Sequence, residues 1–293
     1  MAFAGTAANA QSIVNPGAEA AKSDAKNREA EADTAQRQSS YNMPAINIVG
    51  KPLPKFKDDE LIGDYAQPRW TAQRLFSGTR TYVIPNGVMD FEQWWRFETP
   101  KDKSQPTHLT TQSELEFGLP HHLQIDLYLN TGHDIGSSGP GSSGFSGEVR
   151  WALDDWGKIW GNPTLYLEYT SNSGSPDLIE AKLLLGDALA PGWHWGVNFS
   201  VEQQISGQRT TEKQFTAGIS NSTIDHKLEL GVETRLGWTS AAGSRGHNER
   251  DLQIGPSIRW TPVKQMHLDF APLFGLTSES MKLNAYVILG WEF

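Results

Sequence analysis

The feature that most constrains this chain is a two-residue alternation of apolar and polar side chains, which recurs from about residue 81 to Phe293. Twelve runs of about ten residues carry this alternation, and each run ends in Gly, Pro, Asn, Asp or Ser. In residues 226–238, for example, Val232 lies on the apolar face while Glu229 and Glu233 lie on the polar face. Because side chains alternate between the two faces of a strand, these runs predict strands with two chemically different faces.

The polar face of these runs favours a membrane barrel over a soluble β-domain, which is the alternative. Charged side chains of both signs gather on this face, whereas the polar face of a soluble sheet meets bulk water. Lipid on one side and a polar interior on the other explain both faces, and closure leaves no strand edge unpaired. We therefore predict an all-β fold, a closed antiparallel transmembrane β-barrel of about 12 strands over residues 81–293. The residues expected to line its lumen include Glu114, Glu116, Asp126, Arg150, Lys182, Glu229, Glu233, Arg235, Arg259 and Asp269.

The lengths of the connections agree with this topology. Connections after even-numbered runs are short, such as residues 119–121 and 222–225, whereas residues 132–144 form a long connection after an odd-numbered run. Outer-membrane barrels have short periplasmic turns and longer outer loops, so both ends of the barrel domain are expected in the periplasm. One wide turn, residues 154–162, and one short loop near Ser278 break this rule.

The final nine residues, AYVILGWEF, alternate and end on an aromatic residue. They resemble the closing strand of bacterial outer-membrane β-barrel proteins, whose terminal Phe and alternating apolar residues form the signal read by the barrel-assembly machinery. The resemblance implies that Tyr286, Trp291 and Phe293 belong to this assembly signal. It also implies a location in the bacterial outer membrane, in contact with outer-membrane lipid. The resemblance concerns architecture and identifies no subfamily.

The residues before the barrel divide into two parts. Residues 1–10 end in Ala8-Asn9-Ala10, the form of a signal-peptidase site, and are interpreted as the remnant of a signal peptide. Residues 11–80 form an N-terminal polar arm, extended or helical, because their first part has almost no large apolar side chain to bury. We expect residues 11–60 to reach into the periplasm toward a periplasmic or envelope partner.

The last part of this arm is a candidate plug. Residues 68–80 are basic and contain no acid, while acids outnumber bases on the predicted lumen face. Buried charges must pair or face water, so a basic insert would stabilise such a lumen. We expect this stretch to narrow or plug the barrel from the periplasmic side, and a disordered linker that never enters is the alternative. The residues involved would be Arg69, Trp70, Arg74, Phe76 and Arg80.

Several classes of function and of site are disfavoured. The absence of cysteine excludes disulfides, thiolate metal sites and thiol nucleophiles. A net charge of −9 without a basic block disfavours nucleic acid as a partner, and no apolar run is long enough for a membrane-spanning helix. No G-x-S-x-G, phosphate loop or metal-binding His pair occurs, and Ser257 and His267 both fall on the interior face. His133 and Asp134, adjacent on an outer loop, faintly resemble the acid–histidine pairs of outer-membrane proteases, but such a loop is usually a plain connection.

We therefore expect no enzyme, no cofactor and no metal. Two functions remain open. The first is a porin-like outer-membrane channel for small polar solutes, with an acidic lumen that favours cations. The second is a structural or assembly barrel with a closed lumen, whose N-terminal arm binds a partner.

Overall fold

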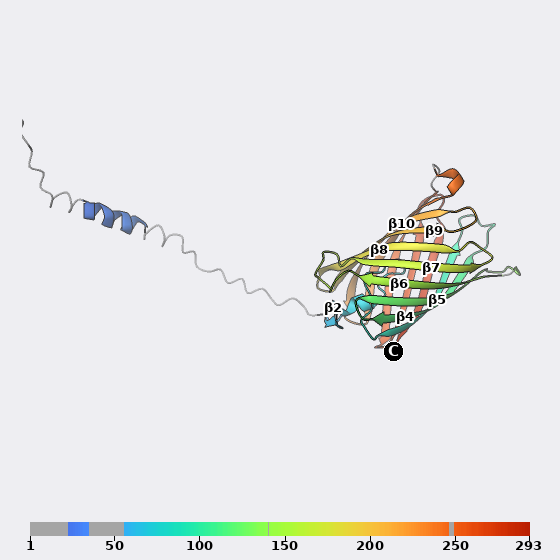
Figure 1. Cartoon of the computed structure of the whole chain (residues 1–293), viewed down its shortest axis with the longest axis horizontal. Coiled ribbons are helices and arrows are strands. Elements are labelled where there is room, and N and C mark those ends of the chain that lie inside the picture. Colours follow the sequence, from blue (N-terminus) through green and yellow to red (C-terminus); the bar gives the residue numbers. More distant parts are fainter. Residues whose placement is uncertain (1–22, 35–55, 140, 246–248) are drawn as a thin grey trace, which may run out of the picture. The chain divides into compact units, whose positions relative to one another are not determined.

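A computed structural model describes residues 23–34, 56–139, 141–245 and 249–293. The chain divides into two compact units, Met1–Pro52 and Leu53–Phe293. In the first unit, residues 23–34 form a helix whose side chains are all exposed, as expected without large apolar residues (Figure 1). The residues assigned to a signal peptide, 1–10, and most of residues 11–60 lie outside the described residues. No helix in the described part of the chain is long and apolar enough to cross a membrane.

In the described part of the second unit, twelve antiparallel strands close into a barrel, with the last strand paired to the first (Figure 1). This confirms the predicted fold, strand number and pairing. Two short strands, β1 (Leu61–Ile62) and β2 (Gln67–Pro68), and a 3₁₀ helix, η1 (Arg69–Ala72), come before the barrel, and a second 3₁₀ helix, η2 (Ala242–Ser244), precedes β12. The barrel strands are β3 (Met89–Thr99), β4 (His108–Leu119), β5 (Leu123–Asp134), β6 (Ser142–Ala152), β7 (Thr164–Ser173), β8 (Leu178–Ala190), β9 (Trp193–Gln204), β10 (Thr211–Ile224), β11 (Leu228–Ser240), β12 (Glu249–Val263), β13 (Met266–Gly275) and β14 (Leu283–Glu292).

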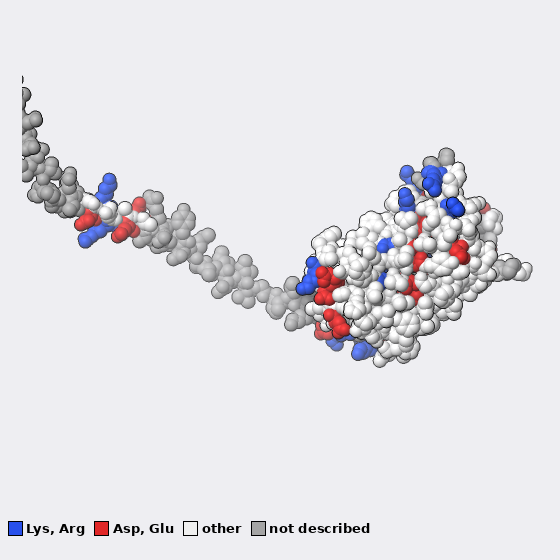
Figure 2. Space-filling model, viewed as in Figure 1, with Lys and Arg blue, Asp and Glu red and all other residues white. Residues whose placement is uncertain are grey.

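The outer wall of the barrel is apolar and exposed, while the inner wall is mostly polar, apart from a buried cluster of Trp94, Ala271, Leu273, Tyr286 and Ile288. Figure 2 shows uncharged residues over most of the wall, with Lys and Arg gathered mainly at its ends. A water-soluble monomer rarely exposes so much contiguous apolar surface, so this wall fits a lipid surround. Outward side chains between 40% and 57% exposed include Leu127, Val149, Leu167, Phe199, Val232 and Ile254.

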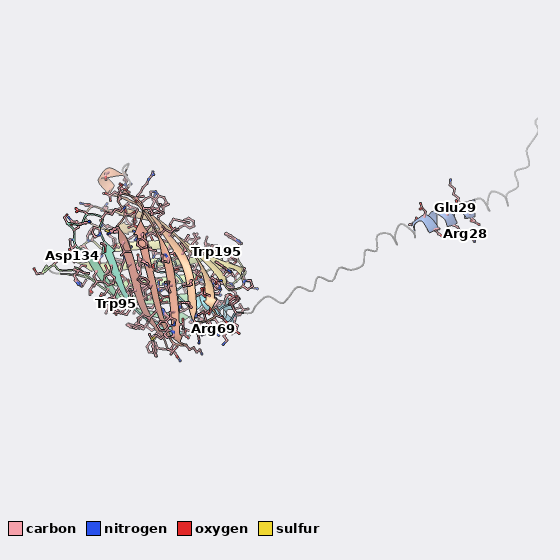
Figure 3. All side chains as sticks on the ribbon, turned by 180° about the vertical axis from the view of Figure 1, so that it is seen from behind. Arg28, Glu29, Arg69, Trp95, Asp134 and Trp195 are labelled. Atoms are coloured by element: carbon pink, nitrogen blue, oxygen red, sulfur yellow. The ribbon has the colours of Figure 1, made fainter. Side chains whose placement is uncertain are left out.

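The two ends of the barrel differ in their connections. Residues 120–122, 191–192, 225–227 and 264–265 form short turns at one end, here called the short-turn end. Longer connections, such as residues 100–107, lie at the opposite, long-loop end. In Figure 3, Asp134 marks the long-loop end and Arg69 the short-turn end. The short-turn end carries one long connection, residues 153–163, as the sequence indicated.

Replacing Val232 by Arg tests the assignment of the outer face. An arginine on the lipid face near the bilayer midplane is expected to cost about 2–4 kcal/mol of unfolding free energy. Urea titration of the protein in phospholipid vesicles would measure this loss, with Val232→Leu as the control that keeps the side chain apolar. Equal stability of the two variants would contradict the assignment.

Candidate functional site in the barrel lumen

Residues 56–88, here called the plug segment, enter the lumen and return to the same end. At the short-turn end, the Asp58 carboxylate accepts hydrogen bonds from the Ser222 hydroxyl, 3.0 Å, and from the His226 backbone N–H, 2.9 Å. Further along, the Thr79 hydroxyl donates to Thr216, halfway along β10, at 2.8 Å. The segment therefore reaches about the middle of the barrel before it turns back toward β3.

Two arginines of the plug segment bind the acids of the wall. Arg74 Nη2 lies 2.6 Å from Glu92 Oε2, 3.4 Å from Glu114 Oε2 and 3.3 Å from Glu116 Oε1. Arg80 Nη2 lies 3.0 Å from Glu114 Oε1 and also pairs with Glu116. All three glutamates are almost completely buried. Because a buried carboxylate without a cation is strongly destabilising, the plug segment and this part of the wall neutralise each other.

Glu116 also belongs to a longer series of acids, here called the acidic row. Eight acids on β3 to β10 lie directly opposite one another in the strand register. Like charges in such cross-strand pairs repel, so neighbouring cations stabilise the row. Wall residues supply some of these cations: Arg150 Nη2 lies 2.8 Å from Asp126 Oδ2, and Lys182 Nζ lies 2.8 Å from Glu180 Oε2. The acidic row consists of Asp90, Glu116, Asp126, Glu148, Glu168, Glu180, Glu202 and Glu212.

On β8, β9 and β10, the plug segment lies against Gly186, Gly196 and Gly218, which face one another across these strands. These three glycines are here called the glycine row. A Cβ atom at Gly218 would lie 2.4 Å from Phe76 Cδ1, and one at Gly186 would lie 2.9 Å from Thr81 Cβ. The next residue in this register is Glu233, which accepts backbone hydrogen bonds from Ser77, 3.1 Å, and Gly78, 3.0 Å. The glycine row thus leaves room for the side chains of Phe76, Thr79 and Thr81 of the plug segment.

Aromatic residues pack against the part of the plug segment that lies nearest the short-turn end. The Trp70 ring is fully buried and stacks on His194, with ring centroids 4.5 Å apart. Arg69 differs from the expectation that it enters the lumen with Arg74 and Arg80. Its backbone N–H donates to the Glu60 carbonyl, 2.9 Å, and its guanidinium lies 3.8 Å from the Glu60 carboxylate, so the small β1–β2 hairpin keeps it at the barrel mouth.

The long connection at the short-turn end, residues 153–163, contacts the plug segment and is here called the clamp turn. The Trp156 backbone N–H donates to the Tyr65 carbonyl at 3.0 Å, and its ring meets the Trp70 ring edge-on at 5.3 Å. The Tyr82 hydroxyl donates to the Asp154 carbonyl at 2.6 Å. Burial raises the pKa of this hydroxyl, so Tyr82 remains a neutral donor. These contacts explain why this turn is longer than the other turns at its end.

Between the plug segment and the long-loop end lies a polar cavity of about 480 Å³. Arg74, Ser77, Gly78 and Arg80 contribute the plug's share of its lining, and β3 to β11 and β14 supply the rest. Of the predicted lumen residues, Glu114, Arg150, Lys182 and Arg235 line this cavity. The others are buried in the wall around the plug segment: Glu116, Asp126, Glu229, Glu233, Arg259 and Asp269.

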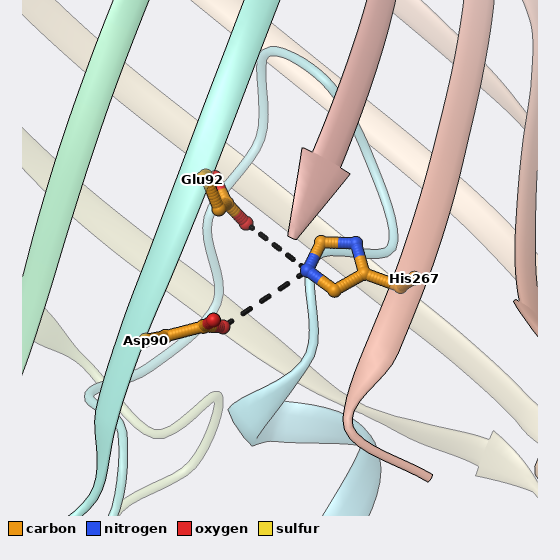
Figure 4. A group of neighbouring side chains, drawn as sticks. All are labelled: Asp90, Glu92 and His267. Carbon is orange, nitrogen blue, oxygen red and sulfur yellow. Dashed lines mark ion pairs between the residues drawn. The ribbon is translucent and has the colours of Figure 1, made fainter. Parts of the chain in front are cut away.

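Two buried groups in the described residues have a spacing that would allow them to hold a metal ion. The first is Asp90, Glu92 and His267, whose Nε2 atom lies 3.6 Å from Glu92 Oε1 and 3.9 Å from Asp90 Oδ2 (Figure 4). The second is Glu92, Glu114 and Glu116. Arg74 pairs with all three glutamates, so within the protein these carboxylates already have a guanidinium partner.

Other sequence-derived candidates fall in different places. Trp291 and Phe293 are exposed at the short-turn end, but Tyr286 points inward, with its ring 5.5 Å from the Arg96 guanidinium. Asp134 pairs with His108 Nδ1 at 2.7 Å rather than with His133. Sequence reasoning gave no role to Trp156 or to the glycine row. Glycines at inward positions of three consecutive strands were the signal that could have indicated this space for the plug segment.

Comparison with known proteins identifies the fold. No protein-family model and no curated protein matches the chain. Among solved structures, an outer membrane channel from Pseudomonas putida F1 matches with a TM-score of 0.53 and 9% identity, covering 74% of this chain and 100% of that one. The NanC porin matches with a TM-score of 0.49 and 11% identity, covering 70% of this chain and 98% of that one. The chain therefore shares the fold of a solved outer-membrane channel, and its closed barrel and apolar outer wall agree with the resemblance that its final residues carry.

Replacing Gly218 by Ala should displace the plug segment without unfolding the barrel, because the new Cβ would overlap the Phe76 ring. Limited trypsin digestion should then cut at Arg74 or Arg80 while heat-modifiable migration on gels stays unchanged. Gly147→Ala, on the outer face of β6 where an added Cβ meets nothing within 4 Å, is the matched control. Resistance of both variants to trypsin would show that the glycine row does not position the plug.

Proposed function

We propose that this protein is an outer-membrane channel for small polar solutes, closed on the periplasmic side by the plug segment. The observation that carries the proposal is the composition of the cavity at the long-loop end. Its lining contains charged, hydroxyl, amide, glycine and aromatic residues, and no aliphatic side chain. A barrel with a purely structural role has no need of a polar vestibule of this size.

The charges around this cavity support a preference for cations. Every cation that lines it has a carboxylate partner: Arg96 Nη2 lies 2.7 Å from Glu98 Oε1, for example, and Arg235 Nη2 lies 2.8 Å from Glu212 Oε1. Glu202 lines the same cavity, and within the described residues no cation lies within 4 Å of its carboxylate. A confined carboxylate attracts cations more strongly than an exposed one, because water screens it less. An acidic lumen is therefore part of the proposal.

We propose in addition that the main role is not catalytic. Within the described residues, each histidine side-chain hydrogen bond goes to an aspartate and none to a serine or threonine hydroxyl. An activated serine needs such a histidine within hydrogen-bond reach. Ser257 and His267 are both buried inside the barrel. We also propose that Trp291 and Phe293 engage the barrel-assembly machinery and that the N-terminal arm contacts a periplasmic or envelope partner.

A reversible cross-link between plug and wall tests the channel. The hydroxyl oxygens of Thr79 and Thr216 lie 2.8 Å apart, and the chain has no cysteine of its own, so Thr79→Cys with Thr216→Cys should form one defined disulfide. In planar bilayers under raised voltage, the oxidised protein should stay closed, and addition of reductant should restore openings carried mainly by cations.

The two single-cysteine variants serve as controls and should behave alike with and without reductant. Equal conductance of the oxidised and reduced double variant would contradict a role for the plug segment in closing the lumen. Absence of conductance in every protein, including the parent, would favour the alternative, a structural barrel whose arm binds a partner.

A further inference from the structure

The clamp turn has an outer side that its contacts with the plug segment do not use. Trp160 is 79% exposed, more than any other large apolar side chain in the described residues, and its neighbour Ile159 is 40% exposed. The Trp160 ring lies 6.0 Å from the ring of Trp195, which belongs to the outer face of β9. The outer side of the clamp turn is therefore continuous with the apolar wall of the barrel.

The position of this patch along the barrel indicates what covers it. Trp151, at the end of β6, and Trp193, at the start of β9, are 47% and 45% exposed at the same end. Indole rings are favoured at the level of the lipid headgroups, where their apolar body and polar N–H are both accommodated. With Trp160, these residues form an aromatic belt at the short-turn end.

The turn is held rigid by its own hydrogen bonds. The Gly157 backbone N–H donates to Asn162 Oδ1 at 2.6 Å, and the Asn162 N–H donates to the Ile159 carbonyl at 3.0 Å. Trp156, which faces the plug segment, and Trp160, which faces outward, are four residues apart within this turn. These hydrogen bonds link the part of the turn that carries Trp156 to the part that carries Trp160.

We propose that the clamp turn is a membrane-anchored latch for the plug segment. Trp160 and Ile159 insert into the interfacial layer of the phospholipid leaflet at the short-turn end, and this anchoring holds Trp156 against Trp70 and Tyr82. The partner of the patch is the lipid interface itself and not a second protein. The docked state of the plug segment thereby depends on the membrane around the barrel.

Thiol labelling in the full-length protein tests the latch. Leu75 is buried in the plug segment, and because the chain has no cysteine, Leu75→Cys provides a single reporter of undocking. In phospholipid vesicles, adding Trp160→Ala should make maleimide labelling of this thiol about tenfold faster, because labelling follows the population of the opened state. Trp160→Phe, which retains an aromatic ring, and Trp151→Ala, which removes another exposed belt residue, should leave the rate near that of the parent.

A spin label at Trp160→Cys in otherwise unchanged protein gives a second, independent measurement. In vesicles of phospholipid alone, its collisions with oxygen and with a water-soluble nickel complex should place it at the headgroup level, in contrast to a label at Lys103→Cys in the long loop. A fully aqueous position at residue 160, or a labelling rate unchanged by Trp160→Ala, would overturn the proposal. Neither readout depends on conduction, so the latch can fail while the proposed channel stands, and the reverse.

Discussion

Neutralisation of buried carboxylates is the constraint on which the rest of this structure depends. The register of β3 to β10 places eight acids opposite one another, and Glu92 and Glu114 add a second pair beside them. The wall supplies cations such as Arg150 and Lys182 for the middle of the acidic row, but Arg74 and Arg80 of the plug segment serve its beginning. Removing one partner of a buried ion pair typically costs about 3–5 kcal/mol, so the empty barrel would be stable only with water or other cations in place of the plug segment.

Shape complements charge where the plug segment meets β8, β9 and β10. The glycine row leaves room for plug side chains such as Phe76 and Thr81, and Glu233 accepts two backbone N–H groups of the plug segment. Polar backbone groups in a confined lumen need such partners, because residues 73–84 of this segment belong to no strand. At the short-turn end, the clamp turn packs against the plug segment. The plug segment, which is mostly coil, can thus occupy the barrel because the wall supplies space and hydrogen-bond partners for it.

The sequence predicted what depends on local pattern. Alternation with period two located the strands and their faces, and connection lengths separated the two ends of the barrel, because both follow from the geometry of a single strand or hairpin. The contrast between the basic residues 68–80 and the acidic wall predicted that Arg74 and Arg80 pair with wall carboxylates. Arg69 was misplaced because a small hairpin, invisible in composition, pairs it with Glu60. The glycine row and the role of Trp156 were missed because they depend on the register between distant strands and on the path of a segment without periodicity.

Hydrogen–deuterium exchange of the intact protein in vesicles tests most directly whether charge pairing docks the plug segment. The backbone N–H groups of Gly78, Arg80 and Ile84 donate to Glu233, Asn198 and Gln124 of the wall. If charge pairing docks the plug segment, these amides should be nearly as protected as those of the barrel strands, and replacing both Arg74 and Arg80 by Gln should remove their protection but not that of the strands. Exchange at the rate of an unstructured chain in the parent protein, or unchanged protection in the double variant, would contradict docking by charge pairing.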